Sequence, residues 1–226
     1  MKNPKGLRPS LKMLGLIVVA TAFVVYLVYV EGGSAGIPSV METYIPIAKT
    51  MIEVPTWFYI PFAVFVILAC TNSLNLTDGL DGLAAGVTSL IMMFFIVAAY
   101  MFGNKDMSAF SAIVCGATIG FLFFNMYPAR VFMGDTGSLA LGGAFCSVAL
   151  ILKMPLILVV VAGVCVVEAI SVILQVTYFK LTKGKRLFKM APIHHHFELC
   201  GVKETVIVPA FWGITLLLSV LAIFMI

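Results

Sequence analysis

Three short stretches of this 226-residue sequence hold polar residues of the types that bind metal ions and phosphates. In the first, NLTDGLDG at residues 75–82, a glycine follows each of Asp78 and Asp81. Glycines let a ligand approach the backbone, and carboxylates hold a metal ion, a base edge or sugar hydroxyls. Spacing of three near a helix start places both carboxylates on neighbouring faces of one turn. The structural alternative is a helix cap, in which Thr77 or Asp78 accepts amide hydrogen bonds and the helix dipole favours Asp81.

The second stretch, GDTGS at residues 134–138, lies at the start of an apolar run. Asp135 and its neighbouring hydroxyls suit a magnesium–phosphate site, because Mg²⁺ takes a few hard oxygen ligands from a protein and completes its shell with water and phosphate oxygens. A helix cap is again the alternative. Three capping aspartates on one side of a protein would be a coincidence, which favours a shared site.

The third stretch, PIHHHFE at residues 192–198, contains every histidine of the chain. Consecutive side chains cannot all face one ligand, so we do not expect this run alone to form a three-histidine zinc site. Imidazoles beside Lys185, Arg186 and Lys189 favour contact with a polyanion such as a phosphate. The alternative is a basic loop held to anionic lipid, which explains the lysines better than the histidines.

A fourth candidate, Glu168, is the single charged residue inside the apolar runs that make up most of the chain. An acid within a membrane is a candidate functional group. The alternative is a helix-to-helix hydrogen bond with a partner such as Ser171 or Gln175.

Composition indicates which elements must position these residues. Hydrophobic residues make up 62% of the chain and charged residues 11%, and the mean hydropathy is +1.13. A soluble globule is excluded, because such domains are roughly 45–50% apolar and about 25% charged. Disorder is excluded because it requires low hydrophobicity. The five cysteines are scattered and form no CxxC pair, so we predict small buried side chains rather than a disulfide framework or a zinc knuckle.

Seven apolar runs are long enough to cross a hydrocarbon core about 30 Å thick. The runs are Met13 to Val30, Trp57 to Leu74, Gly82 to Phe102, Ser108 to Asn125, Gly137 to Leu152, Pro155 to Phe179 and Val206 to Ile226. They lack the alternation of barrel strands, so each is expected to be a helix. The sequence therefore predicts an all-α polytopic membrane protein with seven transmembrane helices and a single domain over residues 1–226.

The basic residues predict the orientation of these helices. Eleven lysines and arginines fall on one side of the seven runs and three on the other. Because basic residues accumulate in the cytoplasm, the N-terminus (with Lys2, Lys5, Arg8 and Lys12) and all three polar stretches are expected there, and the C-terminus outside. The segment from Glu31 to Thr56 then lies outside, where its glycines and prolines predict turns and short extended pieces.

Three motifs carry a family resemblance: NSLNLTDGLDGL at residues 72–83, FMGDTGSLALG at residues 132–142 and MAPIHHHFEL at residues 190–199. Together they resemble those of the polyprenyl-phosphate N-acetylhexosamine-1-phosphate transferases. The first two fit the whole superfamily. The uninterrupted histidines followed by Phe-Glu are typical of the branch that uses UDP-MurNAc-pentapeptide, since the sibling GlcNAc-1-phosphate transferases have a His-x-His pattern. The resemblance extends along nearly the whole chain, from Lys5 onward.

The resemblance implies an enzyme that transfers phospho-MurNAc-pentapeptide from UDP-MurNAc-pentapeptide to undecaprenyl phosphate, which gives lipid I and UMP in peptidoglycan biosynthesis. It implies Mg²⁺ as cofactor, bound by Asp135, in a multi-pass protein of the bacterial inner membrane. Membrane lipid is an expected partner, nucleic acid is not, and the sequence leaves a homodimer open.

The resemblance also implies residue roles. Asp78 and Asp81 would lie in the nucleotide pocket or beside the diphosphate, and Phe132 would stack on the uracil with Asn125 nearby. His194, His195 and His196 would contact the diphosphate or the sugar. Further substrate-binding residues would be Asn72, Asn75, Gly79, Leu80 and Glu198. An apolar groove between spans would hold the prenyl chain, with Glu168 near its mouth.

The sequence departs from the family pattern in its number of spans. Family members have ten, so we expect the missing portion to contain three helices and an Asp-Asp pair upstream of the segment that matches residues 5–12. The chain would then be a truncated gene product, a product of a misplaced start or half of a split protein. Cys200 and Val202 are smaller departures. The alternatives are a sibling transferase that uses UDP-GlcNAc and a transport-like or inactive membrane fragment.

Overall fold

The computed structural model describes residues 9–33 and 36–226, so the predicted cytoplasmic residues Lys2, Lys5 and Arg8 lie outside the described part. Within that part, seven helices are long and apolar enough to cross a membrane. They are α1 (Pro9–Gly32), α2 (Thr56–Thr77), α3 (Leu83–Met101), α4 (Lys105–Asn125), α5 (Gly134–Ile151), α7 (Gly163–Leu181) and α9 (Glu204–Met225). The prediction of an all-α polytopic membrane protein is thereby confirmed.

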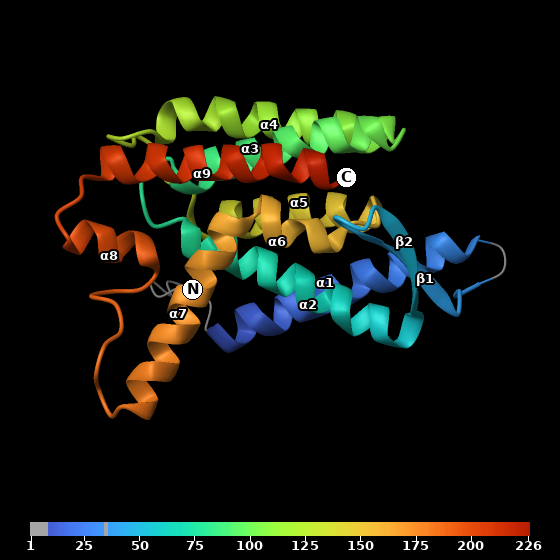
Figure 1. Ribbon diagram of the computed structural model, residues 1–226, viewed down its shortest axis with the longest axis horizontal. Helices are drawn as coiled ribbons and strands as arrows, with labels where there is room; N and C mark the ends of the chain where they lie inside the picture. The colour runs from blue at the N-terminus through green and yellow to red at the C-terminus, as the bar shows by residue number, and fades with distance from the viewer. Residues whose placement is uncertain (1–8, 34–35) are drawn as a thin grey trace, which may run out of the picture.

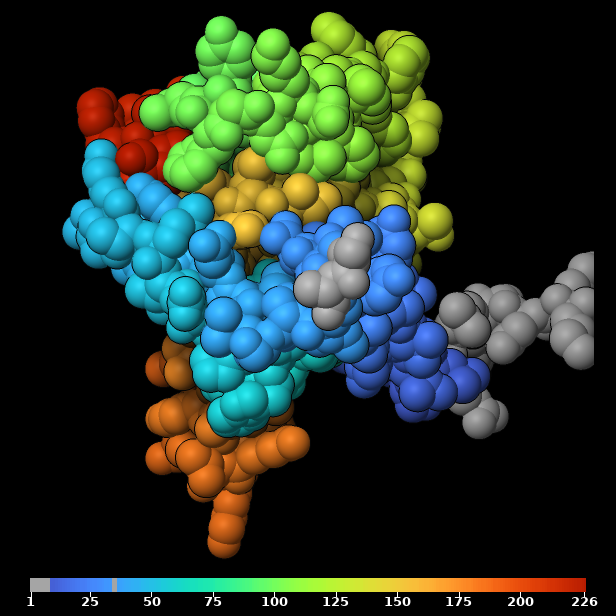
Figure 2. Space-filling model, turned by 90° about the vertical axis from the view of Figure 1, so that its right-hand side faces the viewer, coloured from blue at the N-terminus to red at the C-terminus, as the bar shows by residue number. Residues whose placement is uncertain are grey.

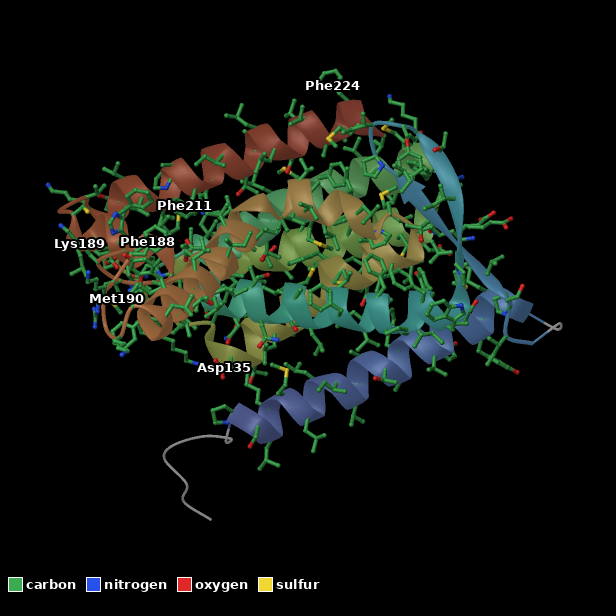
Figure 3. All side chains as sticks on the ribbon, turned by 60° about the horizontal axis from the view of Figure 1, so that its bottom comes forward. Asp135, Phe188, Lys189, Met190, Phe211 and Phe224 are labelled. Atoms are coloured by element: carbon green, nitrogen blue, oxygen red, sulfur yellow. The ribbon has the colours of Figure 1, made fainter. Side chains whose placement is uncertain are left out.

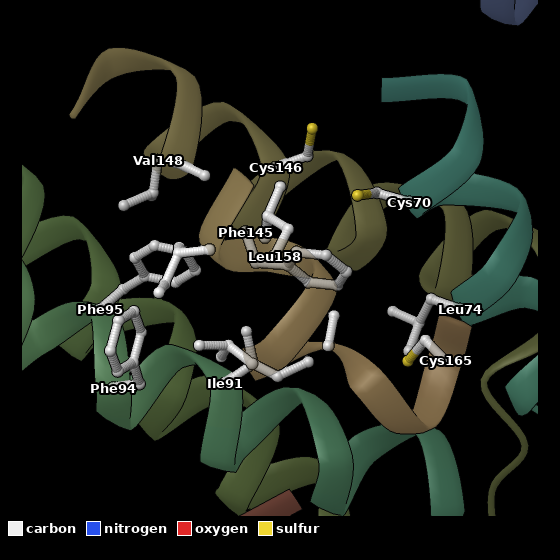
Figure 4. Close-up of a cluster of buried hydrophobic side chains, with 14 of the residues drawn as sticks. Cys70, Leu74, Ile91, Phe94, Phe95, Phe145, Cys146, Val148, Leu158 and Cys165 are labelled. Atoms are coloured by element: carbon white, nitrogen blue, oxygen red, sulfur yellow. The ribbon is translucent and has the colours of Figure 1, made fainter. Parts of the chain in front are cut away.

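The core of the bundle is built around α3, which packs against α4, α5 and α9 (Figure 1). Most of its side chains are buried, including Ile91 and Phe95. In the core these side chains meet Phe145 of α5 and Leu158, which opens the short helix α6 (Leu158–Val161) (Figure 4). Helix α1, in contrast, exposes apolar residues such as Leu14 and Val18 along its length, as expected of a helix that faces lipid.

The sixth predicted span is not one continuous helix. A 3₁₀ turn, η2 (Pro155–Ile157), leads into α6, and α7 begins only at Gly163. Between them Ala162 adopts φ −93° and ψ 24°, outside the α-helical range. Helix α7 consequently slants away from the other spans (Figure 1). The prediction of an uninterrupted span from Pro155 to Phe179 is therefore wrong.

The segment between α1 and α2 forms an antiparallel hairpin of β1 (Val40–Ile45) and β2 (Thr50–Pro55), with Val40 opposite Pro55 and Ile45 opposite Thr50. The predicted short extended pieces are thus two paired strands. The hairpin covers one end of the bundle, close to the C-terminus (Figures 1 and 2). There the Tyr44 hydroxyl donates to the backbone oxygen of Ile226 at 3.3 Å. We refer to this as the hairpin end.

The cysteines are all unpaired and four of them are buried, as predicted. Cys200 is exposed, and the prediction of a buried side chain is wrong for it. It follows the short helix α8 (Ile193–Leu199), which lies outside the bundle core and ends just before this residue.

Candidate active site

Residues 78–82 form a non-helical connection between α2 and α3 at the end of the bundle opposite the hairpin, which we call the site end. Asp78 is the residue after α2, and its backbone N–H donates to Leu74 O at 3.1 Å. Gly82, at φ +77°, precedes the first residue of α3, a conformation that glycine adopts at little cost. The expectation that Asp78 and Asp81 share a helical turn is therefore wrong, because this left-handed residue delays the start of the helix.

The alternative in which Thr77 or Asp78 caps α3 is also wrong. No side chain caps the N-terminus of α3. The Asp81 carboxylate instead accepts from the N–H of Ala129, at 2.9 Å, in the connection between α4 and α5. The Asp81 N–H donates to the carboxylate of Glu204 at the start of α9. The connection between α2 and α3 is therefore fastened to two other segments by side chains.

Asn125, the last residue of α4, makes further hydrogen bonds where the connection at residues 78–82 meets the connection between α4 and α5. We call this meeting point, together with the adjoining ends of the helices, the junction. Its buried side chain accepts from the Gly82 N–H at 3.1 Å and donates to the carbonyl of Val131 at 2.9 Å. A single amide thus holds the start of α3 against the connection that carries Phe132. The Phe132 side chain is 75% exposed, so its ring is free to meet a ligand.

A second network joins α1, α2 and α5 at the same end. Asn75 donates to both Asp135 Oδ1 and Ser138 Oγ, each at 2.9 Å. Lys12 Nζ lies 2.9 Å from Asn75 Oδ1 and 2.9 Å from Asp135 Oδ2. Asp135 lies in the first turn of α5, and its carboxylate bonds to side chains rather than to an N–H of this helix, so the capping alternative is wrong for Asp135.

Asp78 connects the two networks through its charge. Burial and, to a smaller extent, the nearby Asp135 charge raise the pKa of Asp78 to about 6, although the Gly134 N–H that donates to the carboxylate opposes this rise. Two carboxylates that repel each other at one site favour a divalent cation between them.

The three consecutive histidines lie on α8, and each has a different environment. His194 is fully buried and its Nδ1 lies 3.1 Å from Glu168 Oε1. His195 Nδ1 lies 2.5 Å from Glu198 Oε2. His196 Nδ1 accepts from the N–H of Lys189 at 3.1 Å. The histidines therefore do not converge on one ligand.

The histidine helix meets the aspartate connection at Gly79. A Cβ atom at this position would lie 2.2 Å from His194 Nε2, so the imidazole occupies the space that a side chain would need. Asp135 and residues 188–190, which precede α8, lie toward the same end of the bundle (Figure 3). The three predicted stretches are thus brought together, with residues 78–82 between the other two.

Glu168 is buried in α7, but its predicted partners are wrong. The Ser171 hydroxyl donates to the backbone oxygen of Glu168, not to its carboxylate. Gln175 instead accepts from the N–H groups of Leu187 and Phe188. The carboxylate of Glu168 faces α8.

Three other predicted residues lie away from this junction or within the core. The Asn72 amide donates to the Leu68 carbonyl of its own helix at 2.7 Å. Leu80 is a buried core residue. Glu198 pairs with His195. Ser138 belongs to the predicted GDTGS stretch and bonds to Asn75, as its place beside Asp135 suggested. Lys12 and Glu204 were not predicted as parts of the site; Lys12 was counted only as a basic residue of the N-terminal segment.

An apolar groove of about 520 Å³ runs between α2 and the broken sixth span. Its walls include Phe62, Phe65, Val159 and Ile170, and Asn72 and Ser73 also line it. Glu168 is not among the lining residues.

The donor set at the junction bears on metal binding. Within residues 9–33 and 36–226, no three His, Cys, Asp or Glu side chains are grouped to hold a metal ion. These described residues therefore present no closed cage of the kind that structural zinc requires. Asp135 and Asp78 remain a suitable pair for Mg²⁺, which is commonly held by one or two carboxylates together with substrate phosphates.

Comparison with known proteins identifies the family. The family model described as glycosyl transferase family 4 matches residues 4–153. The chain belongs to this family. Among curated relatives, the protein of Acetivibrio thermocellus is 52% identical over 99% of this chain and 66% of its own length. Those of Clostridium acetobutylicum and Clostridium novyi are 46% and 49% identical over 98% and 97% of this chain.

All three relatives are named phospho-N-acetylmuramoyl-pentapeptide-transferase. The chain spans about two thirds of the length of these relatives. Within glycosyl transferase family 4 this similarity agrees with the branch indicated by the three consecutive histidines.

Proposed function

We propose that this chain carries the main site of an enzyme that transfers phospho-MurNAc-pentapeptide from UDP-MurNAc-pentapeptide to undecaprenyl phosphate, releasing UMP and forming lipid I. The observation that carries the proposal is the meeting of Asp135, Asp78 and the histidine helix at one end of a membrane bundle. The names and identity of the relatives support this donor over UDP-GlcNAc.

Phosphoryl transfer needs positioning and charge neutralisation more than covalent chemistry from the protein. Asp135 and Asp78 would hold Mg²⁺, which when bound neutralises the charge of the donor's diphosphate. Asn75 and Ser138 hold the Asp135 side chain in place through the 2.9 Å hydrogen bonds described above. The Lys12 ammonium forms an ion pair with Asp135, which indicates that this carboxylate is accessible to a cation.

The donor's uridine would bind near Phe132. An exposed aromatic ring held by a fixed connection offers a stacking surface for a base. Asn125 fixes that connection through Val131, so its role in this proposal is to position Phe132 while its buried amide stays within the protein. His195 and His196, which are half-buried on α8, would contact the diphosphate or the sugar.

The acceptor's prenyl chain would occupy the apolar groove between α2 and α7. Its lining is almost entirely aliphatic and aromatic, as a hydrocarbon ligand requires. Asn72 and Ser73 lie on the last two turns of α2, near Asn75. A phosphate on the chain would therefore lie near the aspartates. The site end would face the cytoplasm of the inner membrane, as the distribution of basic residues predicts.

The proposal is tested by UMP release in membranes that contain this chain, alone and together with the part of the Acetivibrio thermocellus relative that it does not match. UDP-MurNAc-pentapeptide and UDP-GlcNAc are offered separately with undecaprenyl phosphate and Mg²⁺. We expect release from the first donor only. Release from UDP-GlcNAc alone would assign the sibling reaction, and no release in either arrangement would contradict the proposal.

Orientation is tested separately with a membrane-impermeant thiol reagent. Cys200 is the exposed native cysteine and lies beside α8. We expect it to react in inside-out vesicles and to be protected in intact cells. Reaction in intact cells would place the site on the outer face, where UDP-sugars are absent.

A further inference from the structure

A buried carboxylate joins α7 to the histidine helix. Glu168 and His194 are both 0% exposed. Glu168 Oε2 accepts from the backbone N–H of Ile193 at 2.9 Å. Its other oxygen, Oε1, lies 3.1 Å from His194 Nδ1, off the direction of an ideal hydrogen bond. One side chain therefore contacts two successive residues at the start of α8.

The other edge of the His194 ring faces the connection that carries the aspartates. Its Nε2 is buried, contacts Gly79 where a Cβ would otherwise lie, and has no hydrogen-bond partner among the residues that the structure describes. A buried polar atom without a partner costs free energy. Such an atom directed at a candidate site indicates a contact that a ligand or a water completes.

The chemistry of the pair determines which nitrogen is available. A neutral imidazole carries a proton on one nitrogen, and the hydrogen bond made by one nitrogen sets the role of the other. A carboxylate accepts hydrogen bonds only, so Glu168 favours a proton on Nδ1 of His194. Nε2 is then the nitrogen directed toward Gly79.

We propose that Glu168 is a positioning residue that docks α8 and keeps a proton on His194 Nδ1, so that Nε2 faces the substrate. That Nε2 contacts the substrate rests on the proposed function. That the imidazole proton is on Nδ1 rests on the geometry alone. It explains why an ionisable residue is placed inside the membrane, where an acid is costly unless it has partners.

A carboxylate is required at this position because two donors must be satisfied. Ile193 N–H and His194 Nδ1–H each need an acceptor, and a glutamine offers one oxygen and one N–H₂ group. In Glu168→Gln, either the start of α8 or the His194 ring therefore loses its partner. Ser171→Ala is the matched control, because this buried hydroxyl, on the next turn of α7, bonds only to the Glu168 backbone oxygen.

The experiment is ¹⁵N NMR of the purified protein with ring-labelled histidine, which is tractable because the chain has only three histidines. His195→Gln and His196→Gln assign the His194 signals. We expect a protonated Nδ1 in the wild type and in Ser171→Ala. In Glu168→Gln we expect its resonance to shift or to split between two tautomers. An unprotonated Nδ1 in the wild type would overturn the inference, even if no Glu168 variant folds, and so would an unchanged resonance in Glu168→Gln.

Turnover provides the second readout. We expect Glu168→Gln to lower UMP release about 10- to 100-fold, the range known for loss of the carboxylate partner of a metal-ligating histidine, while Ser171→Ala leaves it within about twofold. If the wild type releases no UMP but Nδ1 is protonated, the proposed function fails and the positioning inference stands. If UMP is released and Glu168→Gln is fully active, the inference fails alone.

Discussion

Two lysine-centred clusters lie at opposite ends of the bundle and have nearly the same geometry. At the hairpin end, Lys153 lies 3.0 Å from Glu31 of α1 and 3.0 Å from Glu42 of β1. At the site end, Lys12 lies 2.9 Å from Asn75 of α2 and from Asp135 of α5. Each cluster joins elements that are distant in sequence, so distances alone do not distinguish a structural cluster from a functional one.

The surroundings make the distinction. The Lys153 cluster ends at its own two carboxylates and ties the hairpin to the bundle. The Lys12 cluster continues from Asp135 to Asp78, whose pKa is raised to about 6. Gly79, the next residue, contacts His194. The Asp135 side chain is also 68% exposed, so solvent or a ligand can reach it. A polar cluster that continues into further titratable groups, and that remains open, is the one suited to chemistry.

The two ends should differ most in how UMP release responds when one carboxylate charge is removed at each end. We expect Asp135→Asn to reduce Mg²⁺-dependent UMP release by about 100- to 1,000-fold, because loss of a metal ligand removes several kcal/mol of charge stabilisation. Glu42→Gln should leave release unchanged. Steady-state assays on equal amounts of membrane-inserted protein measure both, and equal activity of the two variants would remove the distinction between the ends.

Exposed apolar residues provide the next comparison. Phe132 at the site end is 75% exposed and Ile47 at the hairpin end is 79% exposed. Loss of a stacked base costs about 1–3 kcal/mol, so Phe132→Ala should raise the KM for the UDP-sugar about tenfold or more with a smaller change in kcat. Ile47→Ala should change neither. If the KM of Phe132→Ala equals that of the wild type, Phe132 does not stack on the base.

The two lysines should differ in the opposite sense when stability is measured: substitution at the hairpin end should lower stability more than substitution at the site end. Lys153→Met leaves Glu31 and Glu42 close together without their cation, and should lower the free energy of unfolding by about 1 kcal/mol, or roughly 2–4 °C in Tm. Lys12→Met should change Tm less, because water solvates the exposed Asp135, but should lower UMP release. Thermal unfolding in detergent, read by fluorescence, gives the first quantity; a larger Tm loss in Lys12→Met would contradict this assignment.

The smallest expected effect is a pH dependence at Asp78. Folding raises its pKa from the ordinary value of 3.8 to about 6, so the native state holds the proton more tightly than the unfolded chain. The ionised carboxyl therefore destabilises the protein above pH 6, and this penalty disappears below pH 3.8. After allowance for solvent screening of a half-buried group, Asp78→Asn should raise the free energy of unfolding by about 1 kcal/mol at pH 7.5. Near pH 4 the substitution should have little effect.

This pH comparison is made in EDTA, so that no bound metal contributes. Glu42→Gln is the hairpin-end control and should show no such rise. An Asp78→Asn protein that is less stable than the wild type at pH 7.5 would contradict the electrostatic description of the site.

Hydropathy was sufficient to predict the seven spans, because a span must be apolar whatever it packs against. It did not predict the break at Ala162, since Val, Ala and Gly are as apolar in a turn as in a helix. The strands at residues 40–45 and 50–55 were expected only as extended pieces, and the contacts of Tyr44 with Ile226 and Lys153, which hold the hairpin on the bundle, are not visible in local sequence.

The site was predicted by residue type better than by local conformation. Aspartates, asparagines and histidines grouped by loop indicated the correct three segments. The alternative in which Thr77 or Asp78 caps α3 was wrong because Gly82 delays α3 and the Asp78 carboxylate accepts from Gly134 of a different segment. The contact of Gly79 with His194 had a sequence signal, a glycine directly after an aspartate, but its partner could be identified only from the fold.

The most direct test of a single site built from three segments is cleavage of the backbone by Fe²⁺ bound in place of Mg²⁺, with ascorbate and peroxide. Radicals formed at a bound metal cut only nearby chain. We predict cuts within residues 75–82, 130–138 and 190–198, all suppressed by excess Mg²⁺ and absent in Asp135→Asn. Cuts confined to one of these segments, or a pattern unchanged in Asp135→Asn, would contradict the single site.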